Sequence, residues 1–339
     1  MGKWAAAALR HVTDRASAAG GIERVRAVLG PDAPVGRLVA GVRRARVTLN
    51  FHPDRLLADS RTVVVALDAD GRYRSQFETG LSAGSLTAVP GGDRDGWEQV
   101  LFGGAYRDRW VDRPCYGGLN LLAHPDGACP RFGSCHLRLR AAVLDRCTFC
   151  AGDSHLGPVD VGTLAAFEPV LAALVEAAAA GVVLGSRVDL PALARLLLTG
   201  ERPPGTGVVP GRALDDYVEA QVHGGVDLTT DVEAVVADPS FRGTDVGARL
   251  ERLAARRGLP LEWHPGFELA ADAVPPEFRG PAVADFALRV QRAFGVPGAA
   301  LDAALLGRTA AALPRDPETL QLLKRLWHVL VAFGRPCRT

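Results

Sequence analysis

The sequence is poor in lysine: Lys3 and Lys324 are the only two, so nearly all of its 39 basic residues are arginines. It also has little excess charge of either sign, because 39 basic and 38 acidic residues leave a formal net charge of +1. Proteins that bind nucleic acid or anionic membranes through bulk charge have a strong positive excess. The composition therefore disfavours nucleic acid as a partner.

Long apolar runs are missing as well. A short apolar run before Arg10 and His11 is below the length of a secretory signal. The longest run, residues 170–185, is interrupted by Glu176 and falls short of the ~20 residues that a membrane-spanning helix needs. We expect no membrane association and a cytoplasmic location. In that reducing compartment the six cysteines are expected as free thiols or metal ligands rather than disulfides.

Several short motifs are absent too. The sequence has no G-x-x-x-x-G-K-[ST] phosphate loop and no G-x-S-x-G turn, and none of its glycine-rich loops has the strand-then-helix frame of a dinucleotide fingerprint. These absences exclude the common nucleoside triphosphatases and the usual serine hydrolases. The 48% hydrophobic and 23% charged residues are typical of a globular protein with a substantial core.

Hydrophobic periodicity predicts a mixture of helices and short strands. Alternation indicates strands at 45–52, 134–143 and 216–224, and weaker patterns favour strands at 61–67, 71–80 and 261–269. Helices are predicted at 4–29, 165–180, 189–199, 244–257, 282–294, 298–313 and 316–333. The region 80–135 is rich in glycine, proline and aspartate, which is typical of long loops around short strands.

This order of elements predicts an α+β fold with flanking helices and a helical C-terminal third. We expect an N-terminal helical segment at 1–34 and an α+β catalytic-like domain at 35–240. A mainly helical C-terminal region at 241–339 is expected to pack on that domain.

Two of the expected strands carry unusual polar faces. On 216–224 one face is apolar and the other presents Tyr217, Glu219, Gln221 and His223. The strand at 45–52 repeats the pattern, with Asn50 and His52 on its polar face. Antiparallel sheets often turn one polar face to water, which is the simpler explanation. A carboxylate between an aromatic ring and an amide instead favours the wall of a cleft.

An aromatic residue followed by two glycines occurs between these strands. Tyr116 precedes Gly117 and Gly118, and glycine lets the backbone approach a planar ligand that stacks on the ring. A core tyrosine at a turn explains the same residues equally well.

The cysteines offer an alternative site. Cys147 and Cys150 form a C-x2-C pair with His155 nearby, and this spacing suits tetrahedral zinc. A matching second pair is weak, because Cys129 and Cys135 are too far apart, so structural thiols are favoured over zinc. A metal-dependent hydrolase that uses these residues, or a cluster of His52, Asp54 and His223, stays open, as does a binding module without enzymatic activity.

The order of the polar motifs resembles the ADP-ribosyltransferase superfamily of the His-Tyr-Glu kind. A strand ends in His52, a Tyr116-Gly117 step follows, and a later strand with a central Glu219 leads into V-H-G and DLTTDVEAVVAD. The resemblance covers roughly residues 40–240. The chain as a whole also resembles an uncharacterised actinobacterial family of unknown function.

The superfamily resemblance implies a split antiparallel sheet that grips NAD in a cleft, and an enzyme that transfers ADP-ribose from NAD to an unknown acceptor, protein included. It implies that Glu219 is catalytic and hydrogen-bonds the 2′-hydroxyl of the nicotinamide ribose. It also implies that His52 contacts a ribose hydroxyl and that Tyr116 stacks on nicotinamide. The other residues expected to contact the nucleotide are Asn50, Gly117, Gln221 and His223.

The sequence departs from the superfamily at two positions. Pro53 stands where members generally have a glycine whose backbone holds the nicotinamide amide, and proline has no N–H to donate. Tyr217 stands where arginine-modifying members carry Gln or Glu. An arginine acceptor is therefore not implied.

Overall fold

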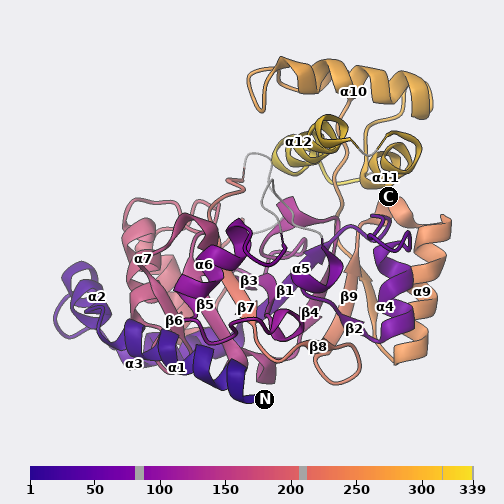
Figure 1. Cartoon of the computed structure of the whole chain (residues 1–339). Helices are drawn as coiled ribbons and strands as arrows, with labels where there is room; N and C mark the ends of the chain where they lie inside the picture. Colours follow the sequence, from indigo (N-terminus) through magenta and orange to yellow (C-terminus); the bar gives the residue numbers. More distant parts are fainter. Residues whose placement is uncertain (81–87, 206–211, 315, 338–339) are drawn as a thin grey trace.

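The core of the chain is one eight-stranded sheet, seen in a computed structural model that describes residues 1–80, 88–205, 212–314 and 316–337 (Figure 1). Neighbouring strands in it are antiparallel except β9 and β10, which are parallel. The α+β class predicted from the sequence is therefore confirmed. The strand order is β10 (Leu261–Trp263), β9 (Val232–Ala237), β4 (Cys135–Leu139), β1 (Arg46–Phe51), β3 (Cys115–Asn120), β7 (Val218–Val222), β5 (Cys147–Ala151) and β6 (Val161–Thr163).

Helices pack around this sheet in groups. At one end lie α1 (Lys3–Ser17), α2 (Gly21–Leu29), α3 (Val35–Gly41), α7 (Glu168–Ala179) and α8 (Leu190–Thr199); at the other lie α4 (Val63–Asp70) and α9 (Asp245–Arg257). The C-terminal helices α10 (Pro281–Phe294), α11 (Ala303–Ala312) and α12 (Pro317–Phe333) pack on one another in a layer of their own, orange to yellow in Figure 1. Short helices α5 (Gln76–Thr79) and α6 (Asp93–Leu101) precede β3, and β2 (Arg72–Tyr73) pairs with β8 (Val226–Asp227).

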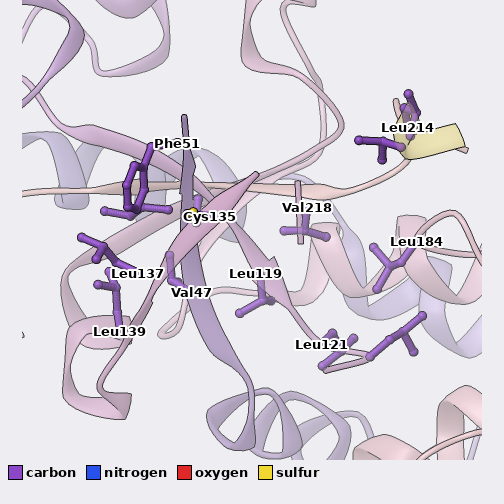
Figure 2. Close-up of a cluster of buried hydrophobic side chains, with 14 of the residues drawn as sticks. Val47, Phe51, Leu119, Leu121, Cys135, Leu137, Leu139, Leu184, Leu214 and Val218 are labelled. Carbon is purple, nitrogen blue, oxygen red and sulfur yellow. The ribbon is translucent and has the colours of Figure 1, made fainter. Parts of the chain in front are cut away.

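The main core lies against one face of the central strands. Val47 and Phe51 of β1 pack there near Leu119 of β3 and Leu137 of β4 (Figure 2), and all four are buried. This is the apolar face that alternation predicts for residues 45–52. Each such side chain contributes roughly 1.5–3 kcal/mol of transfer free energy when it leaves water.

The sheet opens between β1 and β3. These strands pair from Arg46↔Asn120 to Thr48↔Gly118. Beyond that point β1 continues to Phe51 paired with β4, whereas the first part of β3 pairs with β7. The two central strands therefore diverge at one end and leave room between the His52 end of β1 and the Tyr116 end of β3.

Two segments expected as strands form other structures. Residues 61–67 lie mostly in α4, because the helix buries Val64 and Leu67 and packs on α9, and this tertiary packing outweighs the strand preference of its valines. In 71–80 only β2 is a strand. Ser75 and Glu78 then form a capping box, in which each side chain accepts the other's backbone N–H, and α5 begins there.

Other boundaries also differ from the prediction. The helix expected at 4–29 is two helices, because Gly20 adopts a left-handed conformation with φ 64° between α1 and α2. The region 80–135 contains α6 and β3 as well as loops, and its residues 81–87 lie outside the described part. Strands β5, β6 and β9 were not predicted, since short apolar runs buried on both faces do not alternate.

The C-terminal helices lie where periodicity predicts them, although α11 begins at Ala303 rather than at 298. Asp316 caps the start of α12: its carboxylate accepts the backbone N–H of Thr319 at 2.9 Å, and Pro317 is the first residue of the helix. The proposed boundary near 240 stays a prediction, although β10 extends the sheet beyond it. Within the described ranges no helix has both the length and the apolar character that crossing a bilayer requires.

Candidate functional site

A cavity of about 310 Å³ occupies the place where β1 and β3 diverge. Five of the seven residues expected to contact the nucleotide lie in its wall: Asn50, His52, Tyr116, Gly117 and Glu219. They come from β1 and the residue after it, from β3 and from β7, which are adjacent in the sheet. The strand order thus brings together residues that are up to 169 positions apart in the sequence.

Glu219 is the buried carboxylate of this cavity. It is 6% exposed, and Gln221 Nε2 donates a hydrogen bond of 2.7 Å to its Oε1. Burial, together with the negative charge of nearby Asp153, raises the pKa of Glu219 to about 7. Its charge therefore changes near neutral pH.

The other residues on the polar face of β7 lie outside the cavity wall. Gln221 and His223 are fully buried and do not line it. Gln221 accepts a hydrogen bond from Thr148 Oγ1 at 2.6 Å, and the same hydroxyl lies 3.0 Å from His223 Nε2. His223 Nδ1 is 2.5 Å from the Tyr106 hydroxyl, and burial lowers its pKa to about 3. Gln221 positions Glu219, and His223 is a neutral residue held by Tyr106 and Thr148. The nucleotide contacts expected of both stay predictions.

Tyr116 is held by a charged network. Its hydroxyl donates to Glu98 Oε1 at 2.8 Å, and Glu98 Oε2 accepts from Arg113 Nη1 at 2.9 Å. The guanidinium of Arg94 lies 4.6 Å from the centroid of the Tyr116 ring and at the same distance from that of Trp97. Because Arg94 covers one face of Tyr116, a ligand ring can stack only on the other face.

The two glycines after Tyr116 serve packing. A Cβ on Gly117 would lie 2.4 Å from the Thr48 carbonyl oxygen, and one on Gly118 would lie 2.5 Å from Cys129 Sγ. Both distances are shorter than any ordinary contact, so side chains are excluded at this point. The need for glycine comes from neighbouring protein atoms rather than from a ligand.

His52 and Asn50 differ in how free they are to bind a ligand. His52 lies edge-on to Trp327 with 5.0 Å between ring centroids, and burial lowers its pKa to about 3, so its imidazole is neutral. The amide of Asn50 donates to the carbonyls of Asp126 at 3.0 Å and Gly133 at 3.3 Å. Asn50 therefore holds the loop before β4 while it also lines the cavity, and its expected nucleotide contact stays a prediction.

A carboxylate–imidazole pair stands beside Glu219 in the cavity wall. His155 Nδ1 lies 2.6 Å from Asp153 Oδ1, and the Tyr217 hydroxyl donates to Asp153 Oδ2 at 3.0 Å. Burial acts against ionisation of Asp153, but hydrogen bonds from His155 and Tyr217 lower its pKa below the usual value. Asp153 was not singled out from the sequence, where a single aspartate in a loop gives no signal.

The geometry does not support the metal alternatives. Cys147 packs in the main core, whereas Cys150 packs in a separate cluster with Phe102 and Tyr106, so the two thiols lie on opposite faces of β5. In the described part of the chain no three His, Cys, Asp or Glu side chains are grouped to hold a metal ion. The cluster of His52, Asp54 and His223 does not form either, because Asp54 packs against Gly307 and His223 is buried below the cavity.

Positive charge dominates the remaining wall, which the sequence pattern did not reveal. The basic residues come from five separate segments of the chain, so no basic run marks them in the sequence. Three carboxylates also line the cavity: Asp70, Asp153 and Glu219. The lining arginines and lysine are Arg55, Arg72, Arg74, Arg94, Arg131 and Lys324.

Comparison with protein families gives a match over residues 46–333 to a family described as "Protein of unknown function (DUF3626)". The chain belongs to this family. The match begins with the first residue of β1 and ends with the last residue of α12, so the DUF3626 unit includes both the sheet and the C-terminal helices. No curated protein matches the chain.

Proposed function

We propose that this DUF3626 protein is an ADP-ribosyltransferase-like enzyme that breaks the nicotinamide–ribose bond of NAD and transfers ADP-ribose to an acceptor. One observation carries the proposal: His52, Tyr116 and Glu219, distant in the sequence, line one cavity on adjacent strands. NAD is a substrate in this proposal. The six free cysteines fit the cytoplasmic location predicted from the sequence.

The chemistry asked of Glu219 suits its surroundings. As the C1′–N bond breaks, its electron pair leaves with neutral nicotinamide and the ribose develops oxocarbenium character. A fixed carboxylate next to C1′ stabilises that charge, and it does so more strongly in a buried site than in water. Gln221 holds the carboxylate in place at 2.7 Å, so little reorganisation is needed.

The neighbouring residues supply binding. A neutral His52 can exchange a hydrogen bond with a ribose hydroxyl without a charge cost. The uncovered face of Tyr116 offers a surface for the nicotinamide ring. Because Pro53 cannot donate a backbone hydrogen bond, binding of the nicotinamide amide must use other donors.

The Asp153–His155 pair fits a role toward the acceptor. With Nδ1 directed at Asp153, the Nε2 of His155 can accept the proton of an incoming hydroxyl or of water. The acceptor oxygen then bonds to C1′ as nicotinamide departs. In this proposal the acceptor is a neutral O–H nucleophile.

The test is nicotinamide release from labelled NAD by the full-length protein, with water or cell lysate supplying the acceptor. Glu219→Gln keeps the shape of the side chain and removes its charge, so release should fall by about 10²-fold or more. The matched control is Glu251→Gln, an exposed glutamate on α9, which should leave release unchanged. Wild-type protein that releases no nicotinamide and transfers no label under either condition would exclude the proposal.

A further inference from the structure

Three cations from different parts of the chain converge at the α12 side of the cavity. Arg131 on η3 (Pro130–Phe132) and Lys324 on α12 both line it. Arg279, which precedes α10, lies close enough for its charge to lower the pKa of Lys324. The indole of Trp327 donates to the Pro130 carbonyl at 2.8 Å and so fixes α12 against η3.

The positive charge of this cluster is poorly compensated. Arg131 forms an ion pair with Asp215, whose side chain is 66% exposed, and Arg279 reaches the same carboxylate at 3.9 Å. The ammonium of Lys324 has neither a hydrogen bond nor an ion pair within the described residues. Burial, then the charges of Arg131, Arg279 and Arg55, lower the pKa of Lys324.

Buried donors in the cluster also lack partners. In the described part of the chain, Nε of Arg131 and Nε of Arg279 have no hydrogen-bond partner, and neither does either ring nitrogen of His328 on α12. Buried polar groups are normally satisfied, and neighbouring cations repel one another. A bound anion would relieve both costs.

We infer that Arg131, Arg279 and Lys324 form an anion subsite that binds a phosphate or pyrophosphate group at the α12 side of the cavity. Guanidinium groups match phosphate oxygens with paired hydrogen bonds, and the ammonium adds a point charge. The phosphate has two sources in this setting: the pyrophosphate of a dinucleotide in the same cavity, or a phosphorylated acceptor. The inference rests on the cluster itself and not on cleavage of NAD.

The test measures binding of inorganic pyrophosphate to the full chain by calorimetry. Lys324→Gln and Arg131→Gln should each weaken binding by about tenfold, the loss of one charge-assisted hydrogen bond. Asp215→Asn removes the competing carboxylate and should strengthen binding. Arg292→Gln, an exposed charge on α10 that does not line the cavity, should have little effect.

The possible results distinguish the anion subsite from the proposed enzyme. Undetectable binding by wild-type protein, or an equal loss in Arg292→Gln, overturns the inference, and thermal unfolding checks that the variants are folded. If NAD and pyrophosphate compete, the subsite binds the dinucleotide; if both bind together, it binds a phosphorylated acceptor. Pyrophosphate binding without nicotinamide release would leave the subsite standing and exclude only the proposed enzyme.

Discussion

The Glu219 carboxyl is buried, and its ionisation therefore lowers the stability of the fold. Its pKa is about 7 in the folded protein, whereas an exposed glutamate has a pKa of 4.5. Between these values the folded state retains a proton that the unfolded state has lost, so stability falls as pH rises from 4.5 to 7 and stays lower above that. The difference corresponds to about 3 kcal/mol.

Glu219→Gln should therefore stabilise the protein in a pH-dependent way. We expect its free energy of unfolding to exceed that of wild type by up to about 3 kcal/mol at pH 8, with the gain vanishing near pH 4. Urea unfolding at the two pH values measures it. A gain of equal size at both values would show that the burial of charge is not its cause. Lost activity together with gained stability would identify a carboxylate kept for function.

For individual residues, the sequence predicted which side chains share a face better than it predicted their roles. Alternation in 217–223 placed Glu219, Gln221 and His223 on one face, and the structure has them there. It could not reveal what covers that face, because Tyr106 and Thr148, which bind His223, lie 117 and 75 positions away. The two-residue period of a strand fixes the face to which each side chain points, but not whether that face is buried.

The divergence of β1 and β3 is the element-scale feature on which the site depends. Neither strand reveals it alone, since each is regularly paired on its other edge. Gly117 and Gly118 mark the place in the sequence, but the atoms that exclude a side chain there belong to Thr48 and Cys129. The strands themselves were predictable from local alternation, whereas their order and the opening between them depend on contacts distant in sequence.

The contact of α12 with η3 gives a prediction at the same scale. Trp327→Phe removes one of the two hydrogen bonds that the Pro130 carbonyl accepts, because the Gly133 N–H also donates to it at 3.1 Å. The substitution should cost about 0.5–1.5 kcal/mol of unfolding free energy. Because the bond holds Lys324 beside Arg131, pyrophosphate affinity should fall as well. Trp263→Phe on β10, a half-buried position, is the control and should leave that affinity unchanged. Unaltered pyrophosphate binding in Trp327→Phe would show that η3 and α12 keep their places without the bond.

For the whole molecule, the family match extends from β1 to α12, and residues of both of these elements line the cavity. The predicted division at 240 separates Glu219 from Lys324, yet both line the same cavity. Periodicity predicted the C-terminal helices individually. It gave no indication that Lys324 of α12 contributes to the wall of a cavity in the sheet, because an amphipathic pattern tells which face is buried but not against what.

Buried histidines should control the acid stability of the whole molecule. Burial lowers the pKa of His52, His223 and His328 to about 3, so below pH 6.5 the unfolded state binds protons that the folded state does not, and stability falls with pH down to about 3. The raised pKa values of Asp54 and Glu219, both about 7, act in the opposite direction between pH 7 and about 4. The two effects offset each other there, and cooperative unfolding should follow below about pH 4.

His328→Phe isolates this effect, since both ring nitrogens of His328 are buried and unpaired within the described residues. The substitution should stabilise the fold by about 1–3 kcal/mol at neutral pH, where it removes unsatisfied polar atoms. At pH 4 the gain should grow by about 3 kcal/mol, because wild-type unfolding then takes up a proton at this position. The acid midpoint, followed by circular dichroism from neutral pH downward, should therefore move to lower pH. His11→Phe, at an exposed histidine on α1, should leave the midpoint in place, and an equal shift in both variants would mean that burial at 328 does not set it.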